Sequence, residues 1–266
     1  MEPRTDLETD VCILGAGPHG LATAVHLREA DPSLDVSTLD NRDRWLSAWD
    51  DQFAKAEIET LRSPIVHHPG PDPAALMRHV DRHGLSRSGL PYDLPTTEAF
   101  RSFCRTLVEH SGIRDPLPTP PHALRSDGRN VEVDLRDRTI RARHVVIATN
   151  PHRRSIPDWT WPLLGHRPSL VEFASDLDLR ELDDLAGRRI AVIGGGMTAA
   201  HVACGAVSRG ATVHVVTRRP LDVRSFDTDP GWLGPKYLRG YFAVADPSAR
   251  IAMSRAARAG GSIPGI

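Results

Sequence analysis

The sequence has few cysteines, few aromatic residues and no excess of charge of either sign, and these shortages exclude several kinds of site. Its three cysteines, Cys12, Cys104 and Cys204, lie far apart and form neither a C-x-x-C pair nor a zinc-ligand spacing. A local redox pair and a local zinc site are therefore excluded. Cys12 and Cys204 stand in apolar surroundings, and we expect both to be small core residues.

Charge and hydropathy argue against two kinds of partner. The chain of 266 residues has 33 basic and 34 acidic residues, so neither nucleic acid nor a membrane surface is the expected partner. The first ten residues are polar and charged, and no apolar run approaches the length of a membrane span. We therefore expect no secretory signal and a cytoplasmic location.

One stretch, residues 11–40, carries a complete dinucleotide-binding pattern. A short apolar run ends in Gly15-x-Gly17-x-x-Gly20, a helical pattern follows, and a second β-like run ends in Asp40. The glycines permit the turn, a close approach of the backbone to a pyrophosphate, and tight packing of helix on strand, while Asp40 can accept hydrogen bonds from the adenosine ribose. A βαβ unit without a ligand is the alternative. The candidate site comprises Gly15, Gly17, Pro18, His19, Gly20 and Asp40.

The segment after Asp40 leaves two interpretations open. Trp45 and Trp49 lie one helical turn apart and Phe53 extends the same stripe, which predicts an amphipathic helix packed on the nucleotide-binding domain. Alternatively, Arg44 and Trp45 help to cover a ring system bound beside Asp40, and both are therefore candidate cofactor-binding residues.

A proline-rich loop follows. The prolines between residues 64 and 73 forbid a long helix, and such a segment in a compact protein is usually a functional or a mobile loop. One interpretation of His67 and His68 is that they are acid–base residues or metal ligands. The other is that they are structural or surface histidines, which the lack of an Asp, Glu or Cys at ligand spacing favours. Together with Arg62 they are candidate pocket residues.

The middle of the chain predicts packing elements. A helix with one apolar face begins at Thr96 or Thr97, either of which can cap it. Short alternating runs between residues 123 and 142 predict a small β-meander. A buried strand at residues 144–150, which ends in small and polar residues, follows. Thr149, at the end of that strand, is a candidate cofactor-binding residue.

The opening pattern is repeated at residues 188–219. A buried strand, a second glycine turn, a helix and another strand follow one another, and Ala199 replaces the third glycine. The last strand ends in Arg218 and Arg219 instead of an acid. Because an acid rejects a 2′-phosphate and arginine binds it through paired donors, this unit is expected to prefer NADPH to NADH, with a solvated strand end as the alternative. The second candidate site comprises Gly194, Gly196, Met197, Thr198, Ala199, Arg218 and Arg219.

These patterns predict an α/β protein with two Rossmann-like dinucleotide-binding units and a small β-meander. We place the first domain at residues 1–154 and the second, with a C-terminal loop segment, at residues 155–266. The proline-rich run at residues 151–168 is interpreted as the crossing between them.

Two such units in one chain, the first closing on Ala148-Thr149, resemble the two-dinucleotide-binding-domain flavoproteins. That resemblance implies FAD in the first domain and NADPH in the second. The tryptophan-bearing segment, the Leu61-Arg62-Ser63-Pro64 loop and the Phe100-x-x-Phe103-Cys104 helix look more like the flavin-containing and N-hydroxylating monooxygenases, and the missing C-x-x-C argues against the thioredoxin-reductase-like branch. The implied activity uses O2 to oxygenate a small-molecule substrate at a nitrogen, sulfur or carbonyl centre.

The sequence departs from that family at three points. Asn150 replaces a glycine, Glu172 stands near the expected histidine-centred signature, and no Gly-x-x-Asp strand follows Arg219, where only a short helical pattern at residues 251–256 is predicted. The FAD-binding domain therefore looks shortened, and a homo-oligomer or a partner chain could complete it. Two alternatives stay open: an NADPH-dependent flavin reductase or oxidase that oxygenates nothing, and a cofactor-binding protein without turnover.

Overall fold

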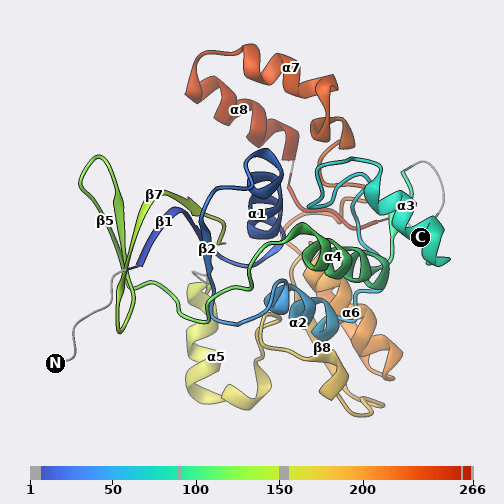
Figure 1. The fold of residues 1–266 in the computed structure, drawn as a ribbon. Helices are drawn as coiled ribbons and strands as arrows, with labels where there is room; N and C mark the ends of the chain where they lie inside the picture. Colours follow the sequence, from blue (N-terminus) through green and yellow to red (C-terminus); the bar gives the residue numbers. More distant parts are fainter. Residues whose placement is uncertain (1–6, 89–91, 150–155, 259, 265–266) are drawn as a thin grey trace. The chain divides into compact units, whose positions relative to one another are not determined.

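The structure is a computed structural model in which the chain divides into two compact units (Figure 1). The first unit consists of residues 1–52 and 65–154, and the second of residues 53–64 and 155–266. Residues 53–64 therefore belong to the second unit, although the sequence analysis placed them in the first domain. The assignment of one cofactor to each domain stays a prediction. The described residues are 7–88, 92–149, 156–258 and 260–264.

A five-stranded mixed sheet forms the centre of the first unit. β1 (Leu7–Leu14) pairs in parallel with β2 (Val36–Leu39) and β7 (Thr139–Ile147), while β5 (Ala123–Ser126), β6 (Val131–Asp134) and β7 form an antiparallel meander. The strand order is β2-β1-β7-β6-β5. The last four residues of β1 are all buried, as expected for a central strand that is covered on both faces. The predicted α/β class is confirmed.

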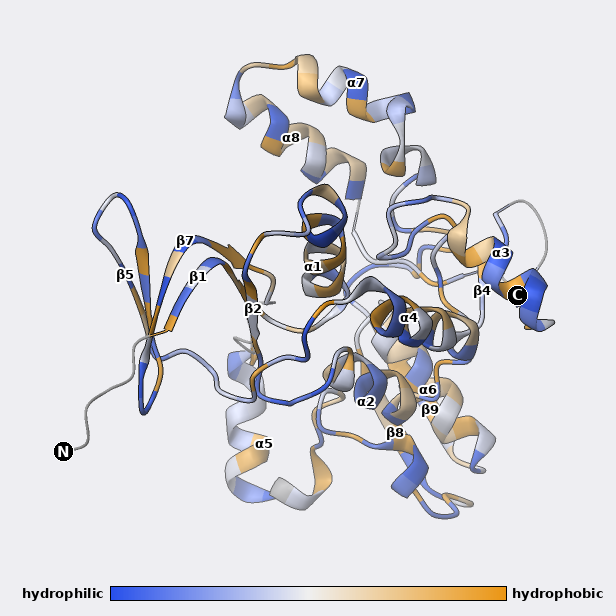
Figure 2. Ribbon diagram, viewed as in Figure 1, coloured by the Kyte–Doolittle hydropathy of each residue, from blue (hydrophilic) through white to orange (hydrophobic). Residues whose placement is uncertain are grey.

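β7 corrects one prediction. The sequence analysis separated a meander run from a buried strand at residues 144–150, but the structure has one continuous strand up to Ile147, because no glycine or proline interrupts it. Only Ile140 and Ala142 are buried in this strand. None of residues 144–147 is buried, contrary to the prediction, and the last of them, Ile147, is 66% exposed. In Figure 2 the ribbon of β7 carries hydrophilic colour along part of its length and hydrophobic colour towards its arrowhead. The core that β7 joins consists of Cys12, Leu14, Leu39, Val133, Leu135, Ile140 and Ala142.

The helices along residues 18–111 are α1 (Pro18–Ala30), α2 (Ser47–Lys55), α3 (Ala75–His83) and α4 (Thr97–Ser111). The start of α4 is confirmed, because the Thr96 side chain accepts a hydrogen bond from the Ala99 N–H at 3.1 Å. The sequence analysis does not predict α3, since the prolines before it indicate a loop. α3 ends at Gly84 in the left-handed conformation. The short strands β3 (Arg87–Ser88) and β4 (Leu94–Pro95) precede α4.

The second unit contains the repeated βαβ pattern. β8 (Arg189–Ile193) and β9 (Thr212–Val216) pair in parallel and are joined by α6 (Met197–Ser208). Of the residues in these two strands only Val192 is buried, which corrects the prediction of a buried strand. A Cβ on Gly205 of α6 would lie 2.7 Å from Leu179, so that face of α6 packs closely. Cys204 is exposed on another face, contrary to the core position expected for it.

The remaining helices of the described chain are α5 (Trp161–His166), α7 (Pro235–Ala243) and α8 (Pro247–Arg258). The pattern at residues 251–256 predicts α8, whereas α5 and α7 are not predicted. Both begin with a proline in the first turn, a position that proline favours although the sequence there reads as a loop.

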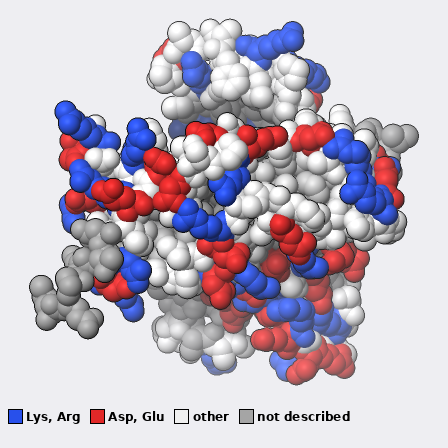
Figure 3. Space-filling model, viewed as in Figure 1, with Lys and Arg blue, Asp and Glu red and all other residues white. Residues whose placement is uncertain are grey.

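Basic and acidic side chains are interspersed over the face shown in Figure 3, in keeping with the balanced composition. Within the described ranges, no helix is both long and apolar enough to cross a membrane. The same residues include no group of three His, Cys, Asp or Glu side chains that could hold a metal ion.

Candidate functional site

The first glycine turn joins β1 to α1 and has no room for a side chain at two of its positions. Gly15 has φ +108°, and a Cβ there would lie 2.9 Å from the Ala148 carbonyl oxygen. A Cβ on Gly20 would lie 1.9 Å from the Gly15 carbonyl oxygen, so the third glycine is required by the contact of helix and turn. Around Gly17, the N-cap of α1, space is open. Unpaired N–H groups at this helix start are suited to a pyrophosphate.

The other residues predicted beside this turn lie close to it. Pro18 stands in the first turn of α1, where its missing N–H costs no hydrogen bond, and His19 is exposed. The Thr149 methyl group would lie 3.1 Å from a Cβ on Gly15, which places the end of the β7 segment against the turn. Asn150, the departure from the family pattern, lies outside the described residues.

Asp40 holds the turn in place. Its Oδ2 accepts a hydrogen bond from the Ala16 N–H at 2.8 Å, and its Oδ1 accepts one from the Arg42 N–H at 3.2 Å. The Ala16 carbonyl in turn accepts from the Leu46 N–H at 2.8 Å, and buried Leu46 adopts φ +62°. The Ala16 peptide is therefore fixed from both sides. A carboxylate has further lone pairs, so these two hydrogen bonds leave Asp40 able to accept from a ribose.

Trp45 is a packing residue in the structure. It is 8% exposed, and its ring N–H donates to the Arg114 carbonyl oxygen at 3.1 Å. With Ala24 and Val36 it lines a small pocket on the first unit. Arg44 is exposed. This arrangement agrees with the packing interpretation, and a role for Arg44 and Trp45 in covering a bound ring stays a prediction.

The two candidate histidines differ in their surroundings. His68 Nδ1 accepts from the Gly70 N–H at 3.1 Å, and its Nε2 lies 3.1 Å from the Pro73 carbonyl oxygen, so Nε2 carries the proton. Burial lowers the pKa of His68, and the ring is therefore a neutral structural group at neutral pH. His67 is exposed. Burial also raises the pKa of Cys12 to about 12, so this thiol is not a nucleophile.

The second glycine turn repeats the geometry of the first. The Gly194 N–H donates to the Val216 carbonyl oxygen at 3.0 Å, as the Gly15 N–H donates to Leu39 at 2.7 Å. Gly194 has φ +146°, and a Cβ there would lie 3.2 Å from the Cβ of Ala199. This distance is short, but a small shift of Ala199 would relieve it.

α6 begins beyond this turn in an open position. Gly196 is the N-cap of α6 and has open space around it, as Gly17 has at the start of α1. Met197 and Thr198 form the first turn, and Thr198 is exposed. The start of α6 is therefore also suited to a phosphate group.

The two arginines that end β9 have different surroundings although both are exposed. Among the described residues, no hydrogen bond or ion pair engages the Arg218 side chain. Arg219 Nη2 donates to the Gly261 carbonyl oxygen at 3.4 Å. Positive charge therefore stands at the strand end that corresponds to Asp40 in the first unit.

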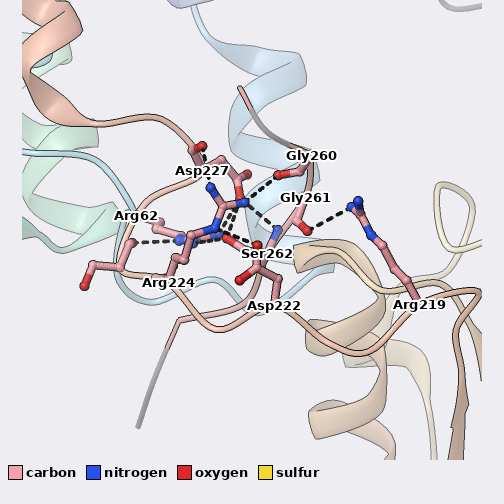
Figure 4. A network of polar contacts seen from close by, with 9 residues as sticks. Arg62, Arg219, Asp222, Arg224, Asp227, Gly260, Gly261 and Ser262 are labelled. Carbon is pink, nitrogen blue, oxygen red and sulfur yellow. Dashed lines mark hydrogen bonds and ion pairs between the residues drawn. The ribbon is translucent and has the colours of Figure 1, made fainter. Parts of the chain in front are cut away.

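A polar network around Arg62 is the part of the second unit that the sequence analysis does not foresee (Figure 4). Arg62, a candidate pocket residue, has a side chain that is only 13% exposed, and its guanidinium donates to Ser225, Arg224, Asp227 and Ser262. These partners lie 162 to 200 positions away in the sequence, so no local pattern could have indicated them. The guanidinium has no free donor to offer a substrate.

Comparison with known families gives a partial match. Residues 120–231 match the family model of the pyridine nucleotide-disulphide oxidoreductases. The matched range contains the meander, β7 and the second glycine turn, but not the first turn. The search of curated proteins finds no match.

Solved structures are similar over nearly the whole chain. The ornithine N-hydroxylase of Kutzneria sp. 744, in a structure with reduced FAD, NADP+ and L-ornithine, has a TM-score of 0.67 and 20% identity, and the match covers 97% of this chain and 65% of that one. The ornithine hydroxylase of Pseudomonas aeruginosa matches with a TM-score of 0.68 and 18% identity, over 97% of this chain and 67% of that one. The chain has the FAD/NAD(P)-binding fold.

The FAD/NAD(P)-binding fold is shared with a different kind of enzyme. The bacillithiol disulfide reductase of Bacillus cereus matches with a TM-score of 0.55 and 18% identity over 97% of this chain and 67% of that one. The fold therefore does not distinguish oxygenation from reduction. The chain spans about two thirds of the length of all three proteins.

Proposed function

We propose that this protein is an FAD- and NADPH-dependent oxidoreductase, and that it is a monooxygenase that uses O2 to oxygenate a small molecule. One observation carries the proposal. Two glycine turns of matching backbone geometry stand at the starts of α1 and α6, and the strands beside them end in opposite charges, Asp40 in one unit and Arg218 with Arg219 in the other.

The first unit fits the adenosine and pyrophosphate of FAD. The open position at Gly17 lets the backbone approach a pyrophosphate, and the helix dipole of α1 favours its negative charge. Asp40 keeps accepting capacity for a ribose hydroxyl beside the turn that it fixes. A 2′-phosphate would be repelled by this carboxylate, so an unphosphorylated adenosine is favoured.

The second unit fits NADPH. Gly196 opens the start of α6 to the pyrophosphate, while Arg218 and Arg219 bring positive charge to the end of the strand that follows α6. FAD, bound at the first turn, would supply the redox chemistry between NADPH and O2. The chain's own residues bind and orient the two cofactors.

The first test is the visible spectrum of the purified protein with added FAD, recorded before and after NADPH without oxygen. A bound flavin band that NADPH bleaches is the expected result. A protein that takes up no FAD would contradict the enzyme proposal. It would favour the cofactor-binding protein without turnover, an alternative motivated by a chain that spans 65% of one similar structure.

A flavin reductase without oxygenation is the second candidate, supported by the match to a disulfide reductase. The monooxygenase and the flavin reductase are distinguished by admitting O2 to the reduced protein and analysing the products. L-ornithine is the first substrate to test, because two similar structures are ornithine hydroxylases. An oxygenated product supports the monooxygenase, whereas stoichiometric hydrogen peroxide with every amine tested supports the oxidase or reductase.

Coenzyme preference gives a direct prediction. Replacing Arg218 and Arg219 together with alanine removes the charge that favours a 2′-phosphate, and a hydrogen bond to a charged group contributes about 1.5–3 kcal/mol. The Kd for NADPH should therefore rise about tenfold more than that for NADH. Titration of both coenzymes checks this, and an equal loss for the two would remove the 2′-phosphate assignment.

A further inference from the structure

Residues 260–263 form a fixed segment on the surface of the second unit. The Ser262 side chain is fully buried, and its hydroxyl and N–H donate to Asp227 Oδ1 at 2.7 and 2.8 Å. Ile263 forms a parallel bridge with Val223, with backbone hydrogen bonds of 2.9 Å from the Arg224 N–H to Ile263 and from the Ile263 N–H to Asp222. The segment is therefore held by hydrogen bonds at Ser262 and by an isolated β-bridge at Ile263.

Arg62 is the centre of this arrangement, as Figure 4 shows. Its Nη2 donates to Ser262 Oγ at 2.7 Å and to the Arg224 carbonyl at 2.6 Å, and its Nη1 donates to the Ser262 carbonyl at 2.9 Å and Asp227 at 3.2 Å. Its Nε donates to the Ser225 carbonyl at 2.8 Å. A guanidinium with so little exposure needs all of these acceptors, so it ties residues 53–64 to two distant segments.

The other side of the same segment touches the proposed coenzyme site. Gly260 has φ +92°, and a Cβ there would lie 2.5 Å from Arg219 Nη2. A Cβ on Gly261 would lie 3.6 Å from the Cα of Gly196. The segment thus lies between the guanidinium of Arg219 and the N-cap of α6.

We propose that residues 260–263 form a wall of the coenzyme site, that Arg62 is the positioning residue of this wall, and that Arg219 holds the wall while Arg218 binds the 2′-phosphate. The ligand in this inference rests on the proposed function. The division between the arginines follows from their contacts. Arg219 packs on Gly260 and donates to Gly261, whereas the described chain gives the Arg218 side chain no partner.

The adjacent arginines provide a matched pair of variants for the test. The dissociation constants of NADP+ and NAD+ are measured by calorimetry, and amide hydrogen exchange is followed at residues 217–221 and 260–264 without ligand. R218A should weaken NADP+ binding about tenfold, with NAD+ binding and hydrogen exchange unchanged. R219A should raise exchange at 260–264 and weaken both coenzymes by a similar factor.

R62Q should have the same effects as R219A. It should also raise amide hydrogen exchange at residues 217–221, although Arg62 makes no contact with them. R239Q, at an exposed arginine of α7, is the control for loss of one positive charge and should change neither readout. Because R62Q can fail to fold, G260A provides a second route, since its Cβ displaces Arg219 while Arg62 stays intact. G187A is its control, because Gly187 also has a positive φ, +74°, but a Cβ there has open space around it.

Two results would overturn the inference and leave the proposed function intact. In the first, the wild type binds both coenzymes and R219A weakens the binding of NADP+ alone. In the second, R62Q and G260A leave amide hydrogen exchange at residues 217–221 unchanged. A wild-type protein that binds neither NADP+ nor NAD+ would instead overturn the proposed function, and with it the coenzyme role of the wall. Parallel loss of both coenzymes in R62Q, R219A and G260A, with raised exchange, supports the inference.

Discussion

The two glycine turns have the same backbone hydrogen bond but different means of holding it. In the first turn, Gly20 contacts the Gly15 carbonyl so closely that no side chain fits, and β1 beside it is buried in a five-stranded sheet. In the second, Ala199 fills the equivalent position, and β8 lies in a two-stranded sheet with mostly exposed residues.

This difference shows that one sequence pattern can be stabilised in two ways. In the first turn, the contact of Gly20 with Gly15 and the hydrogen bond from Ala16 to Asp40 join residues that lie within 25 positions of one another. In the second unit, a polar network around Arg62 fixes the segment beside the turn. Substitutions in the two units should therefore change the stability of the protein by unequal amounts.

The largest expected effect is at the third position of the turns. G20A places a Cβ 1.9 Å from a carbonyl oxygen, so the helix or the turn must move, and we expect a loss of unfolding free energy above about 4 kcal/mol or no folded protein. The matched change A199G relieves a contact and should cost only about 1 kcal/mol of helix propensity. Chemical denaturation measures both, and equal losses would contradict the difference between the turns.

The next effect concerns the residue before each turn. Leu14 is 5% exposed, so L14A should remove about 2–5 kcal/mol of stability, as truncation of a buried leucine does. Ile193 is 57% exposed, and I193A should change stability by about 0.5 kcal/mol or less. Thermal melting of the two variants checks this. A large loss in I193A would mean that another chain or segment covers β8.

The smallest effect is in the pH dependence. In the first unit, burial, His83 and Arg82 lower the pKa of His79, so the folded state keeps this ring neutral while the unfolded chain takes up a proton near pH 6.5. The stabilisation is complete above about pH 6.5 and declines as the pH falls below it. The H79Q side chain cannot be protonated. Between pH 7.5 and pH 5 the melting temperature of H79Q should therefore fall less than that of the wild type.

The second unit should respond in a more acidic range. Hydrogen bonds from Arg180 lower the pKa of Asp178 to about 2. Its stabilisation is present above the unfolded value of about 3.9 and is lost as the pH falls towards 2, so D178N should alter only the acidic side of the profile. A D178N profile that differs from the wild type near pH 6 would contradict this separation.

The sequence predicts the parts of the fold that depend on neighbouring residues. β2 ends directly before Asp40 as predicted, α4 begins at its predicted cap, and both glycine turns precede helices, because a period, a cap or a turn residue is a local signal. The burial of β8 is not predictable in this way. An apolar run such as residues 190–193 reads as buried whatever covers it, and here only Val192 is buried.

The candidate site is predictable to the same extent. The turns, Asp40 and the arginines follow from the motif, but the sequence offers no distinction between Arg218 and Arg219, which only the position of residues 260–261 provides. The surroundings of Arg62 depend on pairings across 162 to 200 positions, and a lone arginine in a proline-rich loop does not indicate them.

The long separation of Arg62 from Ser262 also has a consequence for synthesis on the ribosome. The two residues are 200 positions apart, so at about 5–20 residues per second roughly 10–40 s pass between their additions to the chain. The β1–α1–β2 part of the first unit can assemble during that interval, since its contacts are local. Residues 53–64 cannot, because every acceptor of the Arg62 guanidinium is still to be translated. The earliest-made segment of the second unit is thus among the last to reach its native contacts.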